Sequence, residues 1–171
     1  MRLPRPLALL TSAAIAAGVL CSVPAAADAV TWSVPTTAVV KSPGTMTNED
    51  LENTLMVAIN DARAANGLRK IWSFDSCTDR LAEAWGARIA RTGLFEHRDQ
   101  NEVINRCRNS WAGETLVRGE GLTPQQMVDL WLDSPGHREI LFSPRAKRAG
   151  VAITEDSSGR MIGVVNLVRQ N

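Results

Sequence analysis

Apolar residues recur at intervals of three and four in the first regular part of the chain. This stripe contains Leu51, Leu55, Ala58, Ile59 and Ala62. Such spacing is typical of a helix with one buried face. The preceding segment Thr47–Asp50 supplies a capping side chain and acidic residues, which favour the positive end of a helix dipole. We therefore expect a helix that begins near Thr47 and ends at Gly67.

Two further helices are predicted by similar signals. The second begins at Ser76 or Thr78, stops at Gly93, and buries a face that contains Leu81, Trp85 and Ile89. The third starts at Thr123–Gln126, where a cap, a first-turn proline and a capping-box glutamine stand in their preferred places. Its buried face contains Met127, Leu130 and Trp131.

The end of the chain has a different pattern. Two apolar segments, Gly150–Thr154 and Met161–Val168, flank the turn residues Ser157–Gly159, and this arrangement predicts a β-hairpin. Helices first and strands last indicate the α+β class.

The N-terminus has the three parts of a secretory signal peptide. Arg2 and Arg5 precede the uncharged stretch Leu7–Leu20, and small residues follow at Pro24–Ala29. We expect cleavage after Ala27, which gives a signal peptide over residues 1–27 and a secreted, extracellular protein. Residues 28–46, rich in Pro, Gly, Thr and Ser, are predicted to be a linker before a domain over 47–171. The alternative is a retained membrane anchor, because the uncharged run over 6–27 is long enough to span a bilayer.

Composition narrows the function classes. The chain has 171 residues, 44% of them apolar, so it suits one globular domain with a core. Its 19 basic and 18 acidic residues leave a formal charge of +1, which argues against nucleic acid as a partner. Cys77 and Cys107 remain once Cys21 leaves with the signal peptide, and an even count in an exported protein predicts a disulfide. Two free thiols are the alternative.

Candidate chemistry lies outside the apolar stripes. The chain has two histidines, His97 and His137, both in polar, loop-like surroundings, and Glu114 falls between them. Neither the spacing from His97 to Glu114 nor the spacing from Glu114 to His137 is a compact metal-ligand motif by itself.

Five segments follow one another in a fixed order along the domain. They are Leu55-x4-Asn60-x2-Arg63-x3-Gly67-Leu68, Phe95-x-His97, Gly113-Glu114, Trp131-Leu132-x-Ser134-Pro135-Gly136-His137-Arg138 and Gly150-Val151. Together they resemble the CAP superfamily (cysteine-rich secretory proteins, antigen 5 and pathogenesis-related proteins), in its bacterial, SCP-like branch. The resemblance implies an α-β-α sandwich with a central antiparallel sheet, and a cleft where two histidines and two acidic residues meet. The cleft positions fall on His97, His137 and Glu114. Ser134 stands where eukaryotic members usually have the second glutamate.

Two function classes remain open for this set of residues. The favoured one is a binding or interaction module, expected to be monomeric, whose cleft takes a small apolar ligand, a peptide or a cell-envelope component, or a divalent cation. His97, Glu114 and His137 are together a reasonable set for Zn²⁺. The alternative is a metal-dependent extracellular hydrolase, in particular a protease, which needs a further base. The same three residues also suit a hydrogen-bonded polar cluster without activity, and Ser134 is interpreted as a helix cap rather than a nucleophile.

Other notable residues are expected to be structural. Trp72, Trp85 and Trp131 are predicted to be core or cleft-wall aromatics. Asn60 and Arg63 are predicted to make hydrogen bonds from the first helix to a loop. The basic run Arg145–Arg148 is predicted to be a solvated turn.

Overall fold

The computed structural model describes residues 46–171. The signal peptide expected over 1–27 and all but the last residue of the expected linker lie outside these residues. The elements, in chain order, are α1 (Asn48–Ala65), β1 (Ser73–Phe74), α2 (Ser76–Thr92), α3 (Gln100–Cys107), β2 (Asn109–Glu120), α4 (Pro124–Asp133), α5 (Pro135–Leu141), β3 (Arg148–Glu155) and β4 (Arg160–Gln170).

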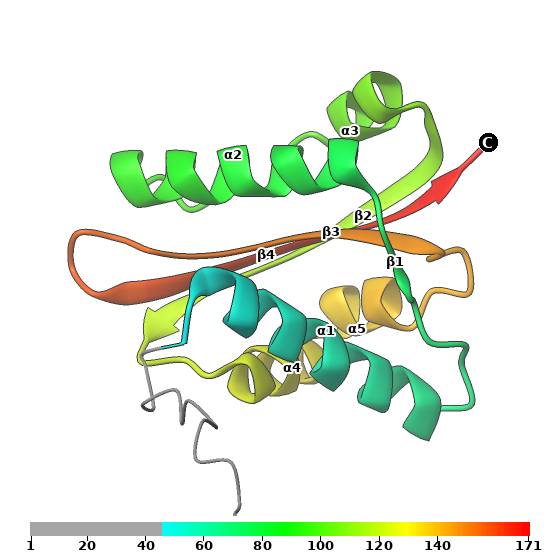
Figure 1. Cartoon of the computed structure of the whole chain (residues 1–171), viewed down its shortest axis with the longest axis horizontal. Coiled ribbons are helices and arrows are strands. Elements are labelled where there is room, and N and C mark those ends of the chain that lie inside the picture. Colours follow the sequence, from blue (N-terminus) through cyan, green and yellow to red (C-terminus); the bar gives the residue numbers. More distant parts are fainter. Residues whose placement is uncertain (1–45) are drawn as a thin grey trace, which may run out of the picture. The chain divides into compact units, whose positions relative to one another are not determined.

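A four-stranded sheet with the order β1-β3-β4-β2 lies between two layers of helices. Helices α2 and α3 cover one face, and α1, α4 and α5 cover the other (Figure 1). Strand β4 pairs antiparallel with both β2 and β3, whereas the short β1 pairs parallel with β3. The predicted α-β-α sandwich with a central antiparallel sheet is therefore confirmed, and β1 is a small parallel addition to it.

Side chains of β2 alternate between the two layers. Ala112 and Leu116 pack with core residues of α2 and α3, whereas Val117 packs with the core of α1 and α4. The larger core, beneath α1 and α4, is built around Leu55, Ile59, Met127, Trp131, Val151, Val165 and Leu167. By this alternation Glu114 faces the α2 and α3 layer. Strand β2 is an edge strand of the sheet, so segments from the two helical layers can approach each other beside it.

The three predicted helices and the final hairpin are confirmed. The prediction that Leu130 belongs to the buried face of the third helix is wrong: it is 48% exposed, because Met127, Val128 and Trp131 form the face of α4 that packs on the core. Helix α1 ends at Ala65, two residues before Gly67, and Gly67 takes the left-handed backbone that follows the helix. The prediction that strands come only after helices is wrong, because β2 lies between α3 and α4. Its buried central stretch includes Gly113, Glu114 and Thr115, and this mixture hides the apolar alternation on which strand prediction depends.

The structural roles expected of Asn60 and Arg63 are confirmed. The amide of Asn60 exchanges two hydrogen bonds with the backbone of Ile71, and the Arg63 guanidinium donates to the carbonyls of Arg69 and Leu141. Both side chains are buried, so these bonds fasten the loop after α1 and the end of α5 to the first helix.

The three tryptophans expected to be buried differ in their solvent exposure. Trp131 is 1% exposed, as expected of a core residue, and Trp85 is half-buried beneath the guanidinium groups of Arg88 and Arg98. Trp72 is 78% exposed, so the prediction that it belongs to the core or the cleft wall is wrong. It directly precedes the two-residue strand β1, and Nζ of Lys70 lies 5.6 Å from the centroid of its ring.

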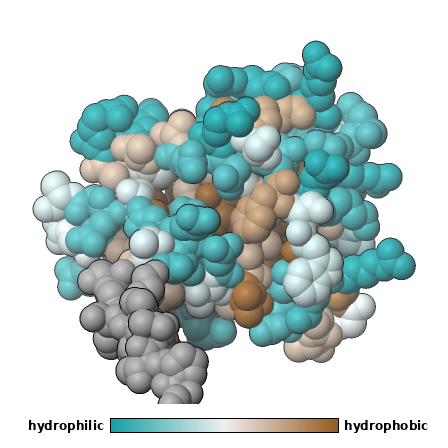
Figure 2. Space-filling model, viewed as in Figure 1, coloured by the Kyte–Doolittle hydropathy of each residue, from teal (hydrophilic) through white to brown (hydrophobic). Residues whose placement is uncertain are grey.

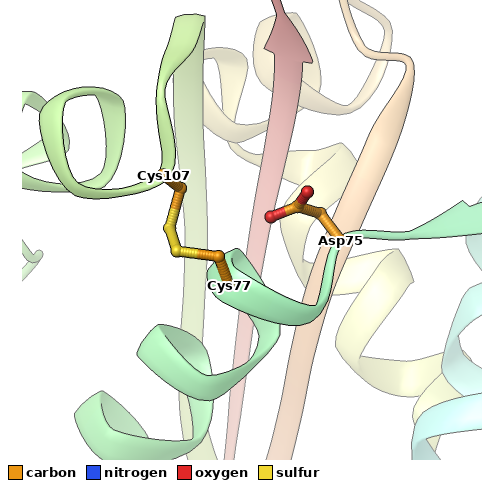
Figure 3. A group of neighbouring side chains, drawn as sticks. All are labelled: Asp75, Cys77 and Cys107. Carbon is orange, nitrogen blue, oxygen red and sulfur yellow. A yellow bond between two sulfur atoms is a disulfide. The ribbon is translucent and has the colours of Figure 1, made fainter.

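The disulfide between Cys77 and Cys107 is confirmed. It joins the first turn of α2 to the last residue of α3, with the two Cα atoms 5.6 Å apart (Figure 3). The bridge holds α3 against α2 and thereby fixes one end of the chain segment that leads from α2 into β2.

The surface seen in Figure 2 is mostly hydrophilic, with apolar side chains showing near its middle. Among residues 46–171, no helix combines the length and the apolar character needed to cross a bilayer.

Candidate functional site

A cleft of about 870 Å³ opens beside the edge strand β2. Its walls come from β2, from α5 with the turn that follows it, and from the segment that precedes α3. The lining includes His97, Glu114, His137, Ser134, Gln100, Trp111, Gly113, Glu139, Ile140, Phe142 and Arg145. All four residues expected from the sequence to form the cleft thus lie in one cavity.

His97 is carried by the loop between α2 and α3, and its neighbour Arg98 anchors that loop. The Arg98 guanidinium is buried, donates to the carbonyl of Leu81 at 2.7 Å, and forms two bonds of 2.8 Å to the carboxylate of Glu102. The two hydrogen bonds from Arg98, and then the one from Arg106, lower the pKa of Glu102 to about 2, so the pair stays charged. The imidazole of His97 therefore extends from a fixed backbone, although 54% of its side chain is exposed.

Glu114 lies behind His97, with its side chain 1% exposed. Its Oε1 accepts from His97 Nδ1 at 2.8 Å and from the backbone N–H of Arg98 at 3.0 Å. Burial raises the pKa of Glu114, and the hydrogen bonds from Arg98 and His97 oppose that rise. The carboxylate thus fixes both the loop and the orientation of the His97 ring.

His137 faces His97 from the opposite wall. It lies in α5, so the prediction of a loop at this position is wrong: Pro135 pre-sets the backbone angle of a first helical turn, and a seven-residue helix follows α4 at once. The two Nε2 atoms are 3.5 Å apart and the ring centroids 5.5 Å apart. Burial, and then the neighbouring His97, lower the pKa of His137, which favours its neutral form.

Ser134 occupies the junction of α4 and α5. It is the last cap of one helix and the first of the next, in agreement with the capping role expected of it. Its side chain forms no capping hydrogen bond, and the residue lines the cleft. Among the described residues no hydrogen bond joins the hydroxyl to His137 or to Glu114, which is the bond between nucleophile and base that a serine hydrolase uses.

The arrangement favours a pair of nitrogen ligands supported by a carboxylate, rather than three ligands side by side. Glu114 contacts Nδ1 of His97, whereas His137 contacts Nε2, so the carboxylate and His137 lie on opposite sides of the His97 ring. An ionised carboxylate only accepts hydrogen bonds, so Nδ1 carries the ring proton and Nε2 keeps its lone pair. Two nitrogens bound to a tetrahedral Zn²⁺ lie about 3.3–3.4 Å apart. The observed separation of 3.5 Å is close to that distance.

A second cluster of ligand-type atoms is explained by structure alone. Asp75, Cys77 and Cys107 bring their side-chain oxygen and sulfur atoms within 4.8 Å of one another. The two sulfurs are bonded together (Figure 3) and cannot act as thiolate ligands. The carboxylate of Asp75 accepts hydrogen bonds from Thr78 and Gln170. Although burial raises the pKa of Asp75, these hydrogen bonds outweigh that effect and lower it. This carboxylate is the cap of α2.

Sequence reasoning missed several cleft residues. Trp111 and Gly113 line the cavity through β2, which was not predicted, and Ile140 follows His137 on the unpredicted α5. Arg145 belongs to the basic run expected to be a solvated turn, yet it also lines the cleft. The signal available for these residues was their proximity in sequence to Glu114 and His137, which is informative only once the local element is known.

Comparisons with known proteins agree with this fold. The sequence profile of the cysteine-rich secretory protein family (CAP) matches residues 56–168, about two thirds of the chain. An outer surface protein from Borrelia burgdorferi superposes with a TM-score of 0.64, at 17% identity over 75% of this chain and 98% of that one. An extracellular protein containing an SCP domain from Bacillus anthracis gives 0.56, at 21% identity over 74% of this chain and 45% of that one.

One relative in sequence is the uncharacterized protein YkwD of Bacillus subtilis strain 168. It is 25% identical to this chain over 114 residues, which are 63% of this chain. The chain covers 44% of that relative's length, so the match concerns one part of it. The identities to the solved structures are too low to transfer function and show the fold alone. The match to the family profile shows more than the fold, because it covers about two thirds of the chain and includes both histidines and Glu114. The chain therefore belongs to the cysteine-rich secretory protein (CAP) family.

Proposed function

We propose that this protein is an extracellular binding module whose cleft holds a divalent cation between His97 and His137 and accepts a ligand beside it. The observation that carries the proposal is the pair of opposed Nε2 atoms 3.5 Å apart, which is close to the separation of two nitrogens bound to a tetrahedral ion. Glu114 supports it from behind His97, in the manner of the carboxylates that orient metal-binding histidines. A bound ion would supply positive charge for an anionic or carbonyl group of the ligand.

The cleft is suited to a ligand larger than an ion. Its volume of about 870 Å³ is within the range of sites for small molecules and short peptides. Trp111, Ile140 and Phe142 supply an apolar wall, and the histidines, Glu139 and Arg145 supply polar groups. A small apolar ligand, a peptide or a cell-envelope component would each bury apolar surface here.

A hydrolase is less well supported by the geometry. Three carboxylates lie near the histidines in sequence, those of Glu96, Asp99 and Asp133, and none of them lines the cleft. Glu96 pairs with Arg88, and Asp99 caps α3. Because Glu114 already accepts two hydrogen bonds, Glu139 is the other carboxylate of the cleft that could act as a base. Within the described residues no hydrogen bond joins Glu139 to either histidine.

Export is part of the proposal. The first 27 residues have the pattern of a cleaved signal peptide. The Cys77–Cys107 bridge supports an oxidising compartment, where such bonds persist. Mass spectrometry of the protein secreted into culture medium should give a mature N-terminus at Asp28. Recovery of the intact chain only from the membrane fraction would contradict cleavage.

Calorimetric titration with Zn²⁺ at pH 7.5 tests the cation site. We expect one saturable site in the wild type and loss of most binding in His97→Ala and in His137→Ala, because each removes one of two nitrogen ligands. Leu94→Ala changes an exposed side chain of the same loop and should leave the titration unchanged. A wild type with no saturable binding would end the proposal.

A further inference from the structure

Two segments that are far apart in the sequence lie side by side at the β1 edge of the sheet. Strand β1 runs parallel to the start of β3, with Ser73 opposite Arg148 and Phe74 opposite Ala149 (Figure 1). Parallel strands begin at the same end of a sheet, so residues 69–72 and 145–147, which lead into the two strands, enter together. Trp72 and the basic run therefore lie at the same end of this edge.

The aromatic part of the β1 edge is open to solvent and firmly held. Trp72 is 78% exposed, more than any other large apolar side chain of the described residues, and Phe74 is 46% exposed. The backbone on both sides of Trp72 is fixed, because Asn60 exchanges two hydrogen bonds with Ile71 and Ser73 pairs with β3. Since the fold leaves both rings in water, burying them against a partner would be favourable.

Basic residues gather at the same edge. The two entering segments and the first residue of β3 include no acidic residue and five basic ones, Arg69, Lys70, Arg145, Lys147 and Arg148. Nζ of Lys70 lies 2.9 Å from the exposed carboxylate of Asp61, and the guanidinium of Arg148 lies 3.9 Å from the buried carboxylate of Asp75. These two cations are therefore compensated.

Two further cations of this edge have no counter-charge. Arg69 and Lys147 are exposed and form no ion pair within the described part of the chain. Arg145 is not counted with them, because it lines the cleft. Basic side chains beside an anionic membrane are attracted to it, and a tryptophan ring prefers the level of the lipid headgroups, where its apolar body and its N–H are both accommodated.

From these features we infer that the β1 edge docks the protein on an anionic lipid surface, where Trp72 and Phe74 enter the headgroup region and Arg69 and Lys147 meet the lipid phosphates. Neither ring lines the cleft, and a strand of two residues is too short to pair with an added strand. Two rings and two free cations give weak, reversible docking. The inference goes beyond the proposed function, because none of these four residues belongs to the cleft.

Sedimentation with lipid vesicles tests the inference on the chain from Asp28 onward, the form expected after export. One set of vesicles is phosphatidylcholine alone, and the other contains about one third phosphatidylglycerol, an anionic lipid. We expect binding to the anionic vesicles to be at least about tenfold tighter, and this preference to disappear in ~0.5 M NaCl, because salt screens the attraction. Trp72→Ala should weaken binding to the anionic vesicles about tenfold and Lys147→Gln about fivefold.

Two matched variants serve as controls. Leu130→Ala changes an exposed apolar side chain on α4, and Arg91→Gln changes an exposed basic side chain on α2. Both should bind the anionic vesicles as the wild type does. Thermal unfolding of every variant shows that the fold is intact.

Equal binding to the two kinds of vesicle, or binding to neither, would overturn the inference, as would wild-type affinity in both Trp72→Ala and Lys147→Gln. Lipid binding lost in His97→Ala and kept in Trp72→Ala would place the lipid in the cleft instead. A dimer that Trp72→Ala abolishes in analytical ultracentrifugation, without binding to vesicles, would assign the edge to a second copy of the chain. A Zn²⁺ titration of the same preparation is independent: zinc binding without lipid binding overturns the docking edge alone, and lipid binding that depends on Trp72 in a protein that takes up no zinc overturns the cation site alone.

Discussion

Replacing Glu114 by glutamine distinguishes an orienting carboxylate from a metal ligand. In the structure a single oxygen, Oε1, accepts both from His97 Nδ1 and from the N–H of Arg98, while Oε2 is buried without a partner among the described residues. The amide oxygen of glutamine can keep both hydrogen bonds, and its NH₂ group takes the place of Oε2. The substitution therefore removes the negative charge and leaves the geometry in place.

The expected loss of Zn²⁺ affinity in Glu114→Gln is about 10- to 100-fold, the range found when the partner behind a metal-binding histidine is changed. This corresponds to about 1.4–2.7 kcal/mol. The charge lies 2.8 Å from Nδ1, and without it the ring is a weaker electron donor at Nε2. The loss should be smaller than in His97→Ala, because a ligand atom remains in position.

Competition titrations at pH 7.5 on the wild type, Glu114→Gln, His97→Ala and Glu120→Gln give the four affinities. Glu120 is an exposed carboxylate at the far end of the same strand, so Glu120→Gln controls for the loss of one charge. Thermal unfolding of each variant without metal shows that the fold is intact. An affinity of Glu114→Gln as low as that of His97→Ala would make Glu114 a direct ligand. An affinity equal to that of the wild type would show that the hydrogen bond does not act on the site. Either result refutes the orienting role.

Three further predictions concern the free energy of unfolding and are measured by urea unfolding. Burial, and then the nearby carboxylates, raise the pKa of Glu52, so Glu52→Gln should stabilise the protein at pH 7 by roughly 0.5 kcal/mol. This gain should vanish as the pH falls below 4.5, because the wild-type carboxyl is then protonated in both the folded and the unfolded state, and a gain independent of pH would contradict the argument. Gly150→Ala places a methyl group 2.4 Å from backbone of α2 and should cost about 3 kcal/mol or more, whereas Gly136→Ala meets no atom within 4 Å and should cost less than about 1 kcal/mol; equal costs would refute the clash. Replacing Cys77 and Cys107 by serine should cost about 3–4 kcal/mol for a separation of 30 residues, and no loss would refute the closure argument.

The helices were predictable from the sequence because their signals are local. Thr47 and Thr123 cap their helices as predicted, and each forms a capping box with the residue three positions later, although a box is expected from the sequence at Thr123 alone. Strand β2 carries no comparable signal, since both of its faces are buried and Glu114 interrupts the apolar run. Its burial is decided by helices far away in sequence, and local periodicity does not contain that information.

The candidate site was predictable in composition but not in geometry. His97, Glu114 and His137 were singled out because histidine is rare in the chain and because their surroundings resemble the CAP pattern. Nothing in a spacing of 17 or 40 residues shows that Glu114 approaches Nδ1 of His97 and that His137 approaches Nε2. That order follows from the layers: the loop bearing His97 and the helix bearing His137 belong to opposite faces of the sheet and meet around its edge.

The buried surroundings of Glu114 argue that this carboxylate serves the cleft rather than the stability of the fold. Asn166 stands directly opposite it on β4, and both polar atoms of the Asn166 side chain, like Oε2 of Glu114, lack a partner within residues 46–171. This polar pair separates two apolar clusters on the same face, one around Leu116 and one around Val168. An apolar pair at the two positions would join the clusters and remove groups whose unpartnered burial costs about 1–3 kcal/mol each. Stability alone therefore favours a different pair of residues. What Glu114 supplies instead is an acceptor that holds the loop of His97 and the orientation of its ring, as the proposed cation site requires.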